Sequence, residues 1–210
     1  MAKLAEGRKS IAYRFTEPVV RLLSKTPITP SAITWFGFLL TVSAAVLIIT
    51  EHLLVAGLVV LIAGFFDMLD GALARHTNQA THFGAVLDST LDRLSEAVLL
   101  LSILALFAFT EGKSALFALL SKEWAVLLVG LALIGSLLVS YIRARAESLG
   151  LECRVGLFTR AERVIVLALG LLLSQIDYAF LVIALAIIVA FSFFTVGQRL
   201  VYVWKQTKIR

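Results

Sequence analysis

Long apolar stretches separated by short polar ones dominate the chain. Three of them contain no charged residue and reach the length of a membrane span, at 26–50, 124–142 and 178–198. Three shorter ones border on ionisable residues, at 53–66, 97–110 and 164–176. Because a helix needs about 20 residues to cross a hydrocarbon layer about 30 Å thick, the shorter stretches become spans when they are extended through their polar ends.

The pattern therefore predicts an all-α integral membrane protein with six transmembrane helices. We expect them at about 32–50, 53–74, 84–110, 124–147, 160–176 and 178–203. Because no linker or repeat divides the chain, residues 1–210 are interpreted as one membrane domain.

An amphipathic segment precedes the first span. Ile11, Phe15, Val19 and Leu22 recur at spacings of three and four, with Arg and Lys residues between them. This pattern is typical of a helix that lies in the membrane interface, and we expect one over about 8–24. A soluble N-terminal tail is the alternative interpretation.

Composition supports the membrane assignment. Hydrophobic residues make up 60% of the chain and charged ones 16%, against about 25% charged in an ordinary soluble domain. The mean hydropathy is +0.96, which excludes soluble, disordered and fibrous classes. On such a chain a net charge of +5 indicates contact with anionic lipid or phosphorylated substrates rather than nucleic acid.

Lys and Arg residues predict the orientation. With six spans, 17 of the 19 Lys and Arg residues lie on one side and only Lys113 and Lys122 on the other. Since positive charge accumulates on the cytoplasmic side, we expect a multi-pass protein of the cell membrane. Both termini and the polar connections at 75–83 and 143–163 then face the cytoplasm.

Five carboxylates interrupt the second and third predicted spans: four aspartates and Glu96. Asp67 and Asp70 are three residues apart, and Asp88 and Asp92 are four apart, so each pair shares one helix face. A charge in hydrocarbon costs about 2.5–3.5 kcal/mol on insertion scales, so such residues face a cavity or a partner. Because the two spans are antiparallel and joined by a short turn, the four aspartates are expected to converge near the cytoplasmic face.

Convergent carboxylates repel one another unless they are neutralised, and Arg75 and Arg93 are too few to do this alone. Bound divalent cations are the simplest solution, since hard metals take oxygen ligands. Two ions about 3.5–4 Å apart would suit phosphoryl chemistry. No His or Cys belongs to the cluster, which disfavours zinc and favours Mg²⁺ or Mn²⁺. A cation transporter that uses the carboxylates as an ion site is an alternative of another class.

The segment from Asp67 to Asp92 reads DMLDGALARHTNQATHFGAVLDSTLD. Its pattern, D-x2-D-G-x2-A-R-x8-G-x3-D-x3-D, matches the signature of the CDP-alcohol phosphotransferase family, which the chain therefore resembles. The resemblance implies six transmembrane helices and a homodimer. It also implies transfer of a phosphoalcohol group from a CDP-linked donor to an alcohol, with release of CMP.

The resemblance also implies roles for individual residues. Two divalent metals would be held by Asp67, Asp70, Asp88 and Asp92. Asp92 would in addition be the general base that deprotonates the acceptor hydroxyl. The CDP-lipid donor would be bound by Ser31, Ala32, Ile33, Thr34, Gly71, Ala74, Arg75, Thr81 and Gly84. For Gly71 and Gly84 taken singly, plain helix packing is the alternative explanation.

Three later segments are similar to one branch of this family. They are SYIRARAESLGL at 140–151, GLFTRAER at 156–163 and GQRLVYVW at 197–204. These look like bacterial phosphatidylinositol phosphate synthases and their archaeal ether-lipid relatives. The resemblance implies CDP-diacylglycerol, or an ether-lipid analogue, as donor and inositol 1-phosphate as acceptor. Glycerol phosphate, serine or another polyol remains an alternative acceptor.

Arginines near the predicted cytoplasmic mouth support a phosphorylated acceptor, because guanidinium groups bind phosphate dianions well. The expected phosphate-binding residues are Ser140, Arg143, Arg145, Arg160, Arg163 and Arg199. Basic residues also gather at cytoplasmic helix ends without any ligand, so topology alone is the competing explanation. Glu147 and Glu162 could pair with these arginines or be solvated.

Overall fold

The computed structural model describes residues 16–109, 122–153 and 155–208, and they are helical apart from short connections. After a short helix over 16–23, the long helices are α2 (Pro30–Ile49), α3 (Leu53–His76), α4 (His82–Phe109), α6 (Lys122–Ser148), α7 (Arg160–Leu173) and α8 (Ala179–Lys208). Each covers one of the predicted spans. The largest differences are at two ends: α7 stops three residues before the predicted 176, and α8 continues five residues beyond 203.

The outer surface of the helices is apolar. Within the described residues, four helices are long and apolar enough to cross a membrane: α2, α3, α6 and α8. On α2, Trp35 and Leu39 are 48% and 60% exposed, and on α8 Trp204 is 54% exposed. A soluble monomer rarely exposes so much contiguous apolar surface. Lipid is the solvent that suits it, so the protein is a membrane protein.

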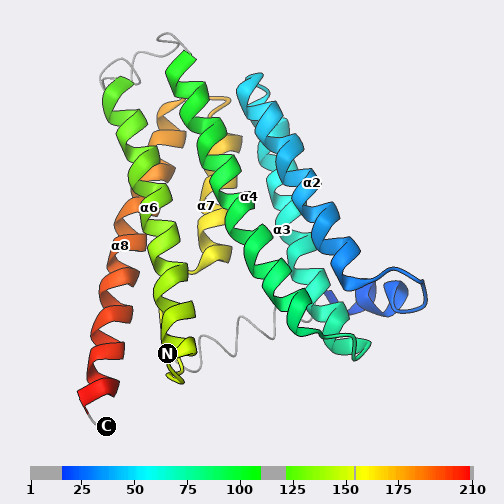
Figure 1. Ribbon diagram of the computed structural model, residues 1–210. Helices are drawn as coiled ribbons and strands as arrows, with labels where there is room; N and C mark the ends of the chain where they lie inside the picture. Colours follow the sequence, from blue (N-terminus) through cyan, green and yellow to red (C-terminus); the bar gives the residue numbers. More distant parts are fainter. Residues whose placement is uncertain (1–15, 110–121, 154, 209–210) are drawn as a thin grey trace.

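The six long helices form a ring (Figure 1). α2 and α3 lie on one side, α6 and α8 on the other, with α4 and α7 between them. Successive neighbours pack in the order α2, α3, α7, α8, α6 and α4, and α4 packs back against α2. Side chains from α3, α4 and α7 can therefore meet inside the ring.

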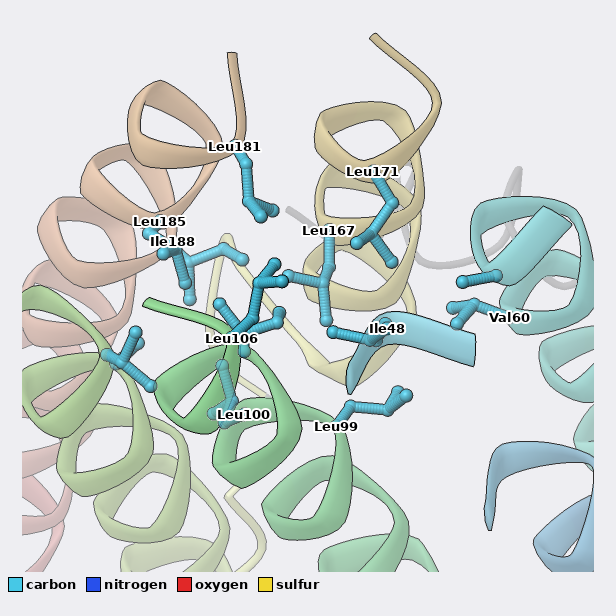
Figure 2. Close-up of a cluster of buried hydrophobic side chains, with 14 of the residues drawn as sticks. Ile48, Val60, Leu99, Leu100, Leu106, Leu167, Leu171, Leu181, Leu185 and Ile188 are labelled. Carbon is cyan, nitrogen blue, oxygen red and sulfur yellow. The ribbon is translucent and has the colours of Figure 1, made fainter. Parts of the chain in front are cut away.

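One end of the ring interior is filled by apolar side chains, as Figure 2 shows. The cluster draws on all six of these helices, with Ile48, Val60, Leu99, Leu100, Leu106, Leu167, Leu171, Leu181, Leu185 and Ile188 among its members. All are at most 4% exposed. The buried charged side chains, among them Asp70 and Arg163, lie toward the other end, where α3 ends and α4 and α7 begin.

Side-chain caps fix the starts of the helices at the polar end. The Thr29 hydroxyl accepts a hydrogen bond from the Ala32 N–H at 3.3 Å, with Pro30 as the first residue of α2. The Thr81 hydroxyl accepts from the Gly84 N–H at 2.9 Å, just before α4. Each cap satisfies an N–H group that the helix itself leaves unpaired, so the polar end of the ring has defined helix starts.

The predicted surface helix is described only in part. Residues 8–15, including Ile11 and Phe15, and Lys113 of the orientation argument lie outside the described residues. Over 16–23, Val20 is buried against the end of α3 while Leu22 is 68% exposed. Val19 is half-buried and packs against the same cluster, so the described part of this helix turns one of the predicted apolar positions toward α3 and leaves Leu22 exposed.

A single glycine controls the closest approach of α7 and α8. A Cβ added at Gly170 would lie 2.5 Å from the Ala184 Cβ, so Gly170→Ala forces the helices apart. Overpacking of this kind costs about 1–3 kcal/mol. We expect a lower midpoint of thermal unfolding in detergent than for the wild type. Gly130→Ala is the matched control, because nothing lies within 4 Å of its added Cβ. Equal midpoints for the two variants would contradict this packing.

Candidate active site

Three of the four predicted carboxylates converge. Asp67 comes from α3 and Asp88 and Asp92 from α4, and one carboxylate oxygen of each lies within 4.8 Å of the others. α3 and α4 are joined by the turn at 77–81 and run antiparallel, which brings their polar ends together. All three side chains are partly buried. The predicted convergence is therefore confirmed for these three aspartates.

Asp70 is not part of this group of three, although it is more deeply buried, at 4% exposure. Its Oδ1 accepts a hydrogen bond from the Gly71 N–H at 2.5 Å. Its Oδ2 is buried and has no hydrogen-bond partner among the residues that the structure describes. Thr34 of α2 lies beside the same carboxylate. An unpaired buried carboxylate oxygen is costly, which makes Asp70 a candidate ligand next to the group.

Arg160, at the start of α7, contacts the carboxylate group directly. Its Nη1 donates a hydrogen bond to Asp67 Oδ2 and lies 2.5 Å from Asp92 Oδ1 as an ion pair. From the sequence, Arg160 was expected to bind phosphate, and its contact with the aspartates was not predicted. Arg160 and Arg93, which interacts with Asp88, do not balance four carboxylates, so an excess of negative charge remains.

The residues fit a divalent metal of the hard type. Every ligand that the cluster offers is a carboxylate oxygen, the donor that Mg²⁺, Mn²⁺ and Ca²⁺ prefer. The excess negative charge and the unpaired oxygen of Asp70 both favour a bound cation. Asp67, Asp88 and Asp92, with Asp70 beside them, are the residues that could hold it.

Two cavities meet at the carboxylates. An apolar cavity of about 410 Å³ lies between α2, α3, α4 and α7 and reaches the buried cluster at Leu99 and Ile188. A polar cavity of about 380 Å³ lies between α4, α6, α7 and α8. The two cavities share four lining residues: Asp92, Glu96, Arg160 and Arg163. A lipid and a polar molecule could therefore approach the same point from different sides.

The polar cavity gathers most of the predicted phosphate-binding residues. It is lined by Ser140, Arg143, Arg160, Arg163 and Arg199, together with Asp88 and Asp92. Arg145 is exposed and lies outside it. The cavity thus brings four arginines from α6, α7 and α8 to the carboxylate group.

Each of these arginines is held differently. Arg199 is 4% exposed; its Nε donates to the Val155 carbonyl at 2.9 Å and its Nη1 to the Val139 carbonyl. It therefore ties α8 to α6 and to the connection before α7. Arg143 is exposed and forms an ion pair with Glu147 at 2.8 Å.

Glu162 caps α7. Its Oε2 accepts hydrogen bonds from the Thr159 N–H at 2.7 Å and from the Thr159 hydroxyl at 2.5 Å. This capping box fixes the first turn of α7, which carries Arg160 and Arg163.

Of the predicted donor-binding residues, only Thr34 lines either cavity. Ile33 is buried against Leu69 and Leu73. Ser31 is half-buried and Ala32 exposed at the start of α2. A Cβ at Gly71 would lie 3.4 Å from the Arg75 guanidinium, so the glycine leaves room for Arg75. Ala74 is half-buried on the same helix, and Thr81 and Gly84 form the cap of α4.

Sequence reasoning gave no role to Glu96, which forms a buried ion pair with Arg163. Arg163 Nε donates to Glu96 Oε1 at 2.5 Å, and Nη2 donates to Oε2 at 2.9 Å. The available signal was spacing: Glu96 follows Asp88 and Asp92 at intervals of four, so all three share one face of α4.

Comparison with known proteins identifies the family of the chain. Residues 27–194 match the family described as CDP-alcohol phosphatidyltransferase. An archaetidylinositol phosphate synthase of Methanothermobacter thermautotrophicus is 37% identical over 202 residues, which are 95% of this chain and 94% of the archaeal protein. A phosphatidylinositol phosphate synthase of Corynebacterium glutamicum is 35% identical over 201 residues, 95% of this chain and 88% of that protein.

Solved structures of a relative have a similar fold. The phosphatidylinositol phosphate synthase of Mycobacterium tuberculosis with CDP-DAG bound aligns with a TM-score of 0.78 at 33% identity, covering 91% of this chain and 94% of the other. The same enzyme in complex with manganese and citrate also has a TM-score of 0.78, with 90% and 88% covered. This chain belongs to the CDP-alcohol phosphatidyltransferase family and is a membrane-embedded transferase of phospholipid biosynthesis.

Proposed function

We propose that the protein transfers the phosphatidyl group, or its ether-lipid counterpart, from a CDP-linked lipid to inositol 1-phosphate. The products are phosphatidylinositol phosphate and CMP. The observation that carries the proposal is the junction of two cavities of opposite character at Asp92. With the family established, a cation transporter no longer needs to be invoked.

The polar cavity supports a phosphorylated acceptor. Its arginines offer planar, bidentate donors that match a phosphate dianion. Arg199 is buried and its described hydrogen bonds go to backbone carbonyls, so an acceptor phosphate would supply a counter-charge that a neutral acceptor such as serine would not. Arg143, Arg160, Arg163 and Arg199, with Ser140, are the proposed phosphate-binding residues. The exposed Arg145, also predicted from the sequence, would act only at the cavity mouth.

Inositol 1-phosphate is favoured over glycerol 3-phosphate by the relatives. The archaeal and bacterial relatives reported above are synthases of archaetidylinositol phosphate and phosphatidylinositol phosphate. Both candidate acceptors carry a phosphate, so arginine chemistry alone does not separate them. The preference for inositol 1-phosphate therefore rests on similarity along almost the whole chain.

The apolar cavity supports a lipid donor. Its walls are formed by side chains such as Phe38, Leu61 and Phe65, and it reaches the carboxylate group at Asp67. The M. tuberculosis relative binds CDP-DAG. We assign the lipid part of the donor to this cavity. The cytidine diphosphate is assigned to the helix starts and small residues at the polar end: Ser31, Ala32, Ile33, Thr34, Gly71, Ala74, Arg75, Thr81 and Gly84.

Two divalent ions, Mg²⁺ or Mn²⁺, are proposed for the carboxylates Asp67, Asp70, Asp88 and Asp92. The excess of negative charge around Arg160 and the manganese complex of the relative support divalent metal. When bound, the metal neutralises the diphosphate and stabilises CMP as the leaving group. Asp67 from α3 and Asp88 from α4 lie close together and are among the residues that would hold the metal.

The chain's own residues would supply the proton transfer and the orientation. Asp92 lines both cavities, where it can accept the proton of the acceptor hydroxyl. The acceptor oxygen then forms a bond to the phosphorus that bears the lipid, and the bond from that phosphorus to CMP breaks. The arginines of the polar cavity would hold the acceptor phosphate away from the reacting phosphorus, so that its hydroxyl is the group that attacks.

The six-helix topology, the orientation and the dimer are part of the same proposal. α4, at 28 residues, is long enough to span despite its charges. α7 has 14 residues, about 21 Å, and would span with help from the turn that follows it. The helix ends rich in Arg and Lys would face the cytoplasm, as would the active site. A homodimer is expected from the family resemblance.

The proposed reaction is tested by an acceptor panel. Purified protein in detergent with Mg²⁺ and CDP-diacylglycerol should release CMP with inositol 1-phosphate, and at least tenfold more slowly with glycerol 3-phosphate, serine or inositol. CMP release is measured by chromatography, with omission of acceptor as the control. Turnover with glycerol 3-phosphate alone would replace the proposed acceptor, and turnover with unphosphorylated inositol would remove the role of the arginines.

Asp92→Asn tests the general base. Asparagine keeps the shape but cannot take the proton, so turnover should fall by about 10²–10⁴-fold. Binding of the CDP-lipid, measured by equilibrium titration, should persist. Asp177→Asn is the control, because Asp177 lies in the connection between α7 and α8 at the other end of the ring. Wild-type turnover in Asp92→Asn would refute the assignment.

A further inference from the structure

The buried ion pair between Glu96 and Arg163 joins α4 to α7 across the ring. The two side chains are 11% and 2% exposed. Both Glu96 oxygens are engaged by Arg163, through Nε at 2.5 Å and Nη2 at 2.9 Å. Two parallel hydrogen bonds fix the plane of a guanidinium as well as its position. Arg163 is therefore held in one orientation.

That orientation leaves one nitrogen of Arg163 unused. Nη1 is buried and has no hydrogen-bond partner in the described part of the chain. In the planar guanidinium it lies on the side opposite the Nε–Nη2 edge that faces Glu96. Arg163 lines the polar cavity together with Ser140 and Arg199. A buried cationic donor without a partner calls for a ligand, and an anion in this cavity would provide one.

Glu96 also gives Arg163 a carboxylate partner other than the aspartates of the carboxylate group. On α4, Asp92 and Glu96 are one turn apart, and on α7, Arg160 and Arg163 are one turn apart. Two ion pairs therefore connect α4 and α7, one turn apart: Arg160 with Asp92, and Arg163 with Glu96. If Glu96 lost its charge, the nearest carboxylate one turn away would be Asp92, and Arg163 would be drawn toward it.

We propose that Glu96 is a positioning residue for acceptor binding, because it aims Arg163 Nη1 at the acceptor's phosphate and keeps Arg163 away from Asp92. The inference rests on the proposed function, since it takes the acceptor to be phosphorylated. Although Glu96 lines both cavities, both of its oxygens bind Arg163, and we assign it no direct contact with either substrate. Its effect is therefore expected on the acceptor and not on the CDP-lipid.

Glu96→Gln is the test variant, because it keeps the size of the side chain but removes the charge and one of the two acceptor oxygens. We expect the KM for inositol 1-phosphate to rise about tenfold, with the KM for the CDP-lipid within twofold of wild type. The inhibition constant of inorganic phosphate, a competitor for the same nitrogen, should rise in parallel. Glu17→Gln, which breaks the exposed pair with Arg21, is the matched control and should change neither value.

Variants of Arg163 show whether Glu96 acts through it. Arg163→Ala should raise the acceptor KM at least as much, and Glu96→Gln should add no further increase in the Arg163→Ala background. Glu96→Asp keeps the charge and should lie between wild type and Glu96→Gln, which covers the case in which Glu96→Gln does not fold. Additive effects, or an equal rise in both Michaelis constants, would overturn the positioning role.

The inference and the proposed function fail in different ways. If wild type uses a phosphorylated acceptor and phosphate inhibits it, yet Glu96→Gln and Glu96→Asp match wild type in acceptor KM and phosphate inhibition, only the positioning role is wrong. If wild type uses an unphosphorylated alcohol and phosphate does not inhibit it, the proposed function fails and this inference falls with it.

Discussion

Uncompensated negative charge inside a ring of apolar helices is the constraint on which this structure depends. Asp67, Asp88 and Asp92 meet within a few ångströms, in surroundings where charges are poorly solvated. Arg160 supplies part of the compensation, and divalent cations are proposed to supply the rest. Both cavities meet at these side chains. This agrees with the proposed substrates, because the diphosphate of a donor and the phosphate of an acceptor are anions that divalent cations and arginines attract.

The apolar packing of the ring is what makes the charged end precise. Leu99, Leu167 and Ile188 close the opposite end (Figure 2), and the contact of Gly170 with α8 holds α7 against its neighbour. The capping box at Thr159 then fixes the first turn of α7. Arg160 and Arg163 consequently reach α4 at defined heights. A shift of α7 would move both arginines at once.

The sequence predicted the helices and the convergence of aspartates because both follow from local spacing. Asp88 and Asp92 share a face by periodicity, and a short turn brings Asp67 near them. The contacts of the arginines could not be predicted from local spacing. Whether Arg160 contacts aspartates, and whether Arg163 meets Glu96, depends on the rotation of α7 about its axis relative to α4, which no local pattern encodes. Arg199 illustrates the same limit, since its bonds to the Val139 and Val155 carbonyls depend on tertiary packing.

The most direct test of the central claim is a crystal structure of the protein soaked with Mn²⁺, with anomalous diffraction recorded at the manganese absorption edge. The account predicts two anomalous peaks about 3.5–4 Å apart, between the carboxylates of Asp67, Asp70, Asp88 and Asp92. A single site elsewhere in the ring, or carboxylates turned away from one another toward lipid, would contradict it.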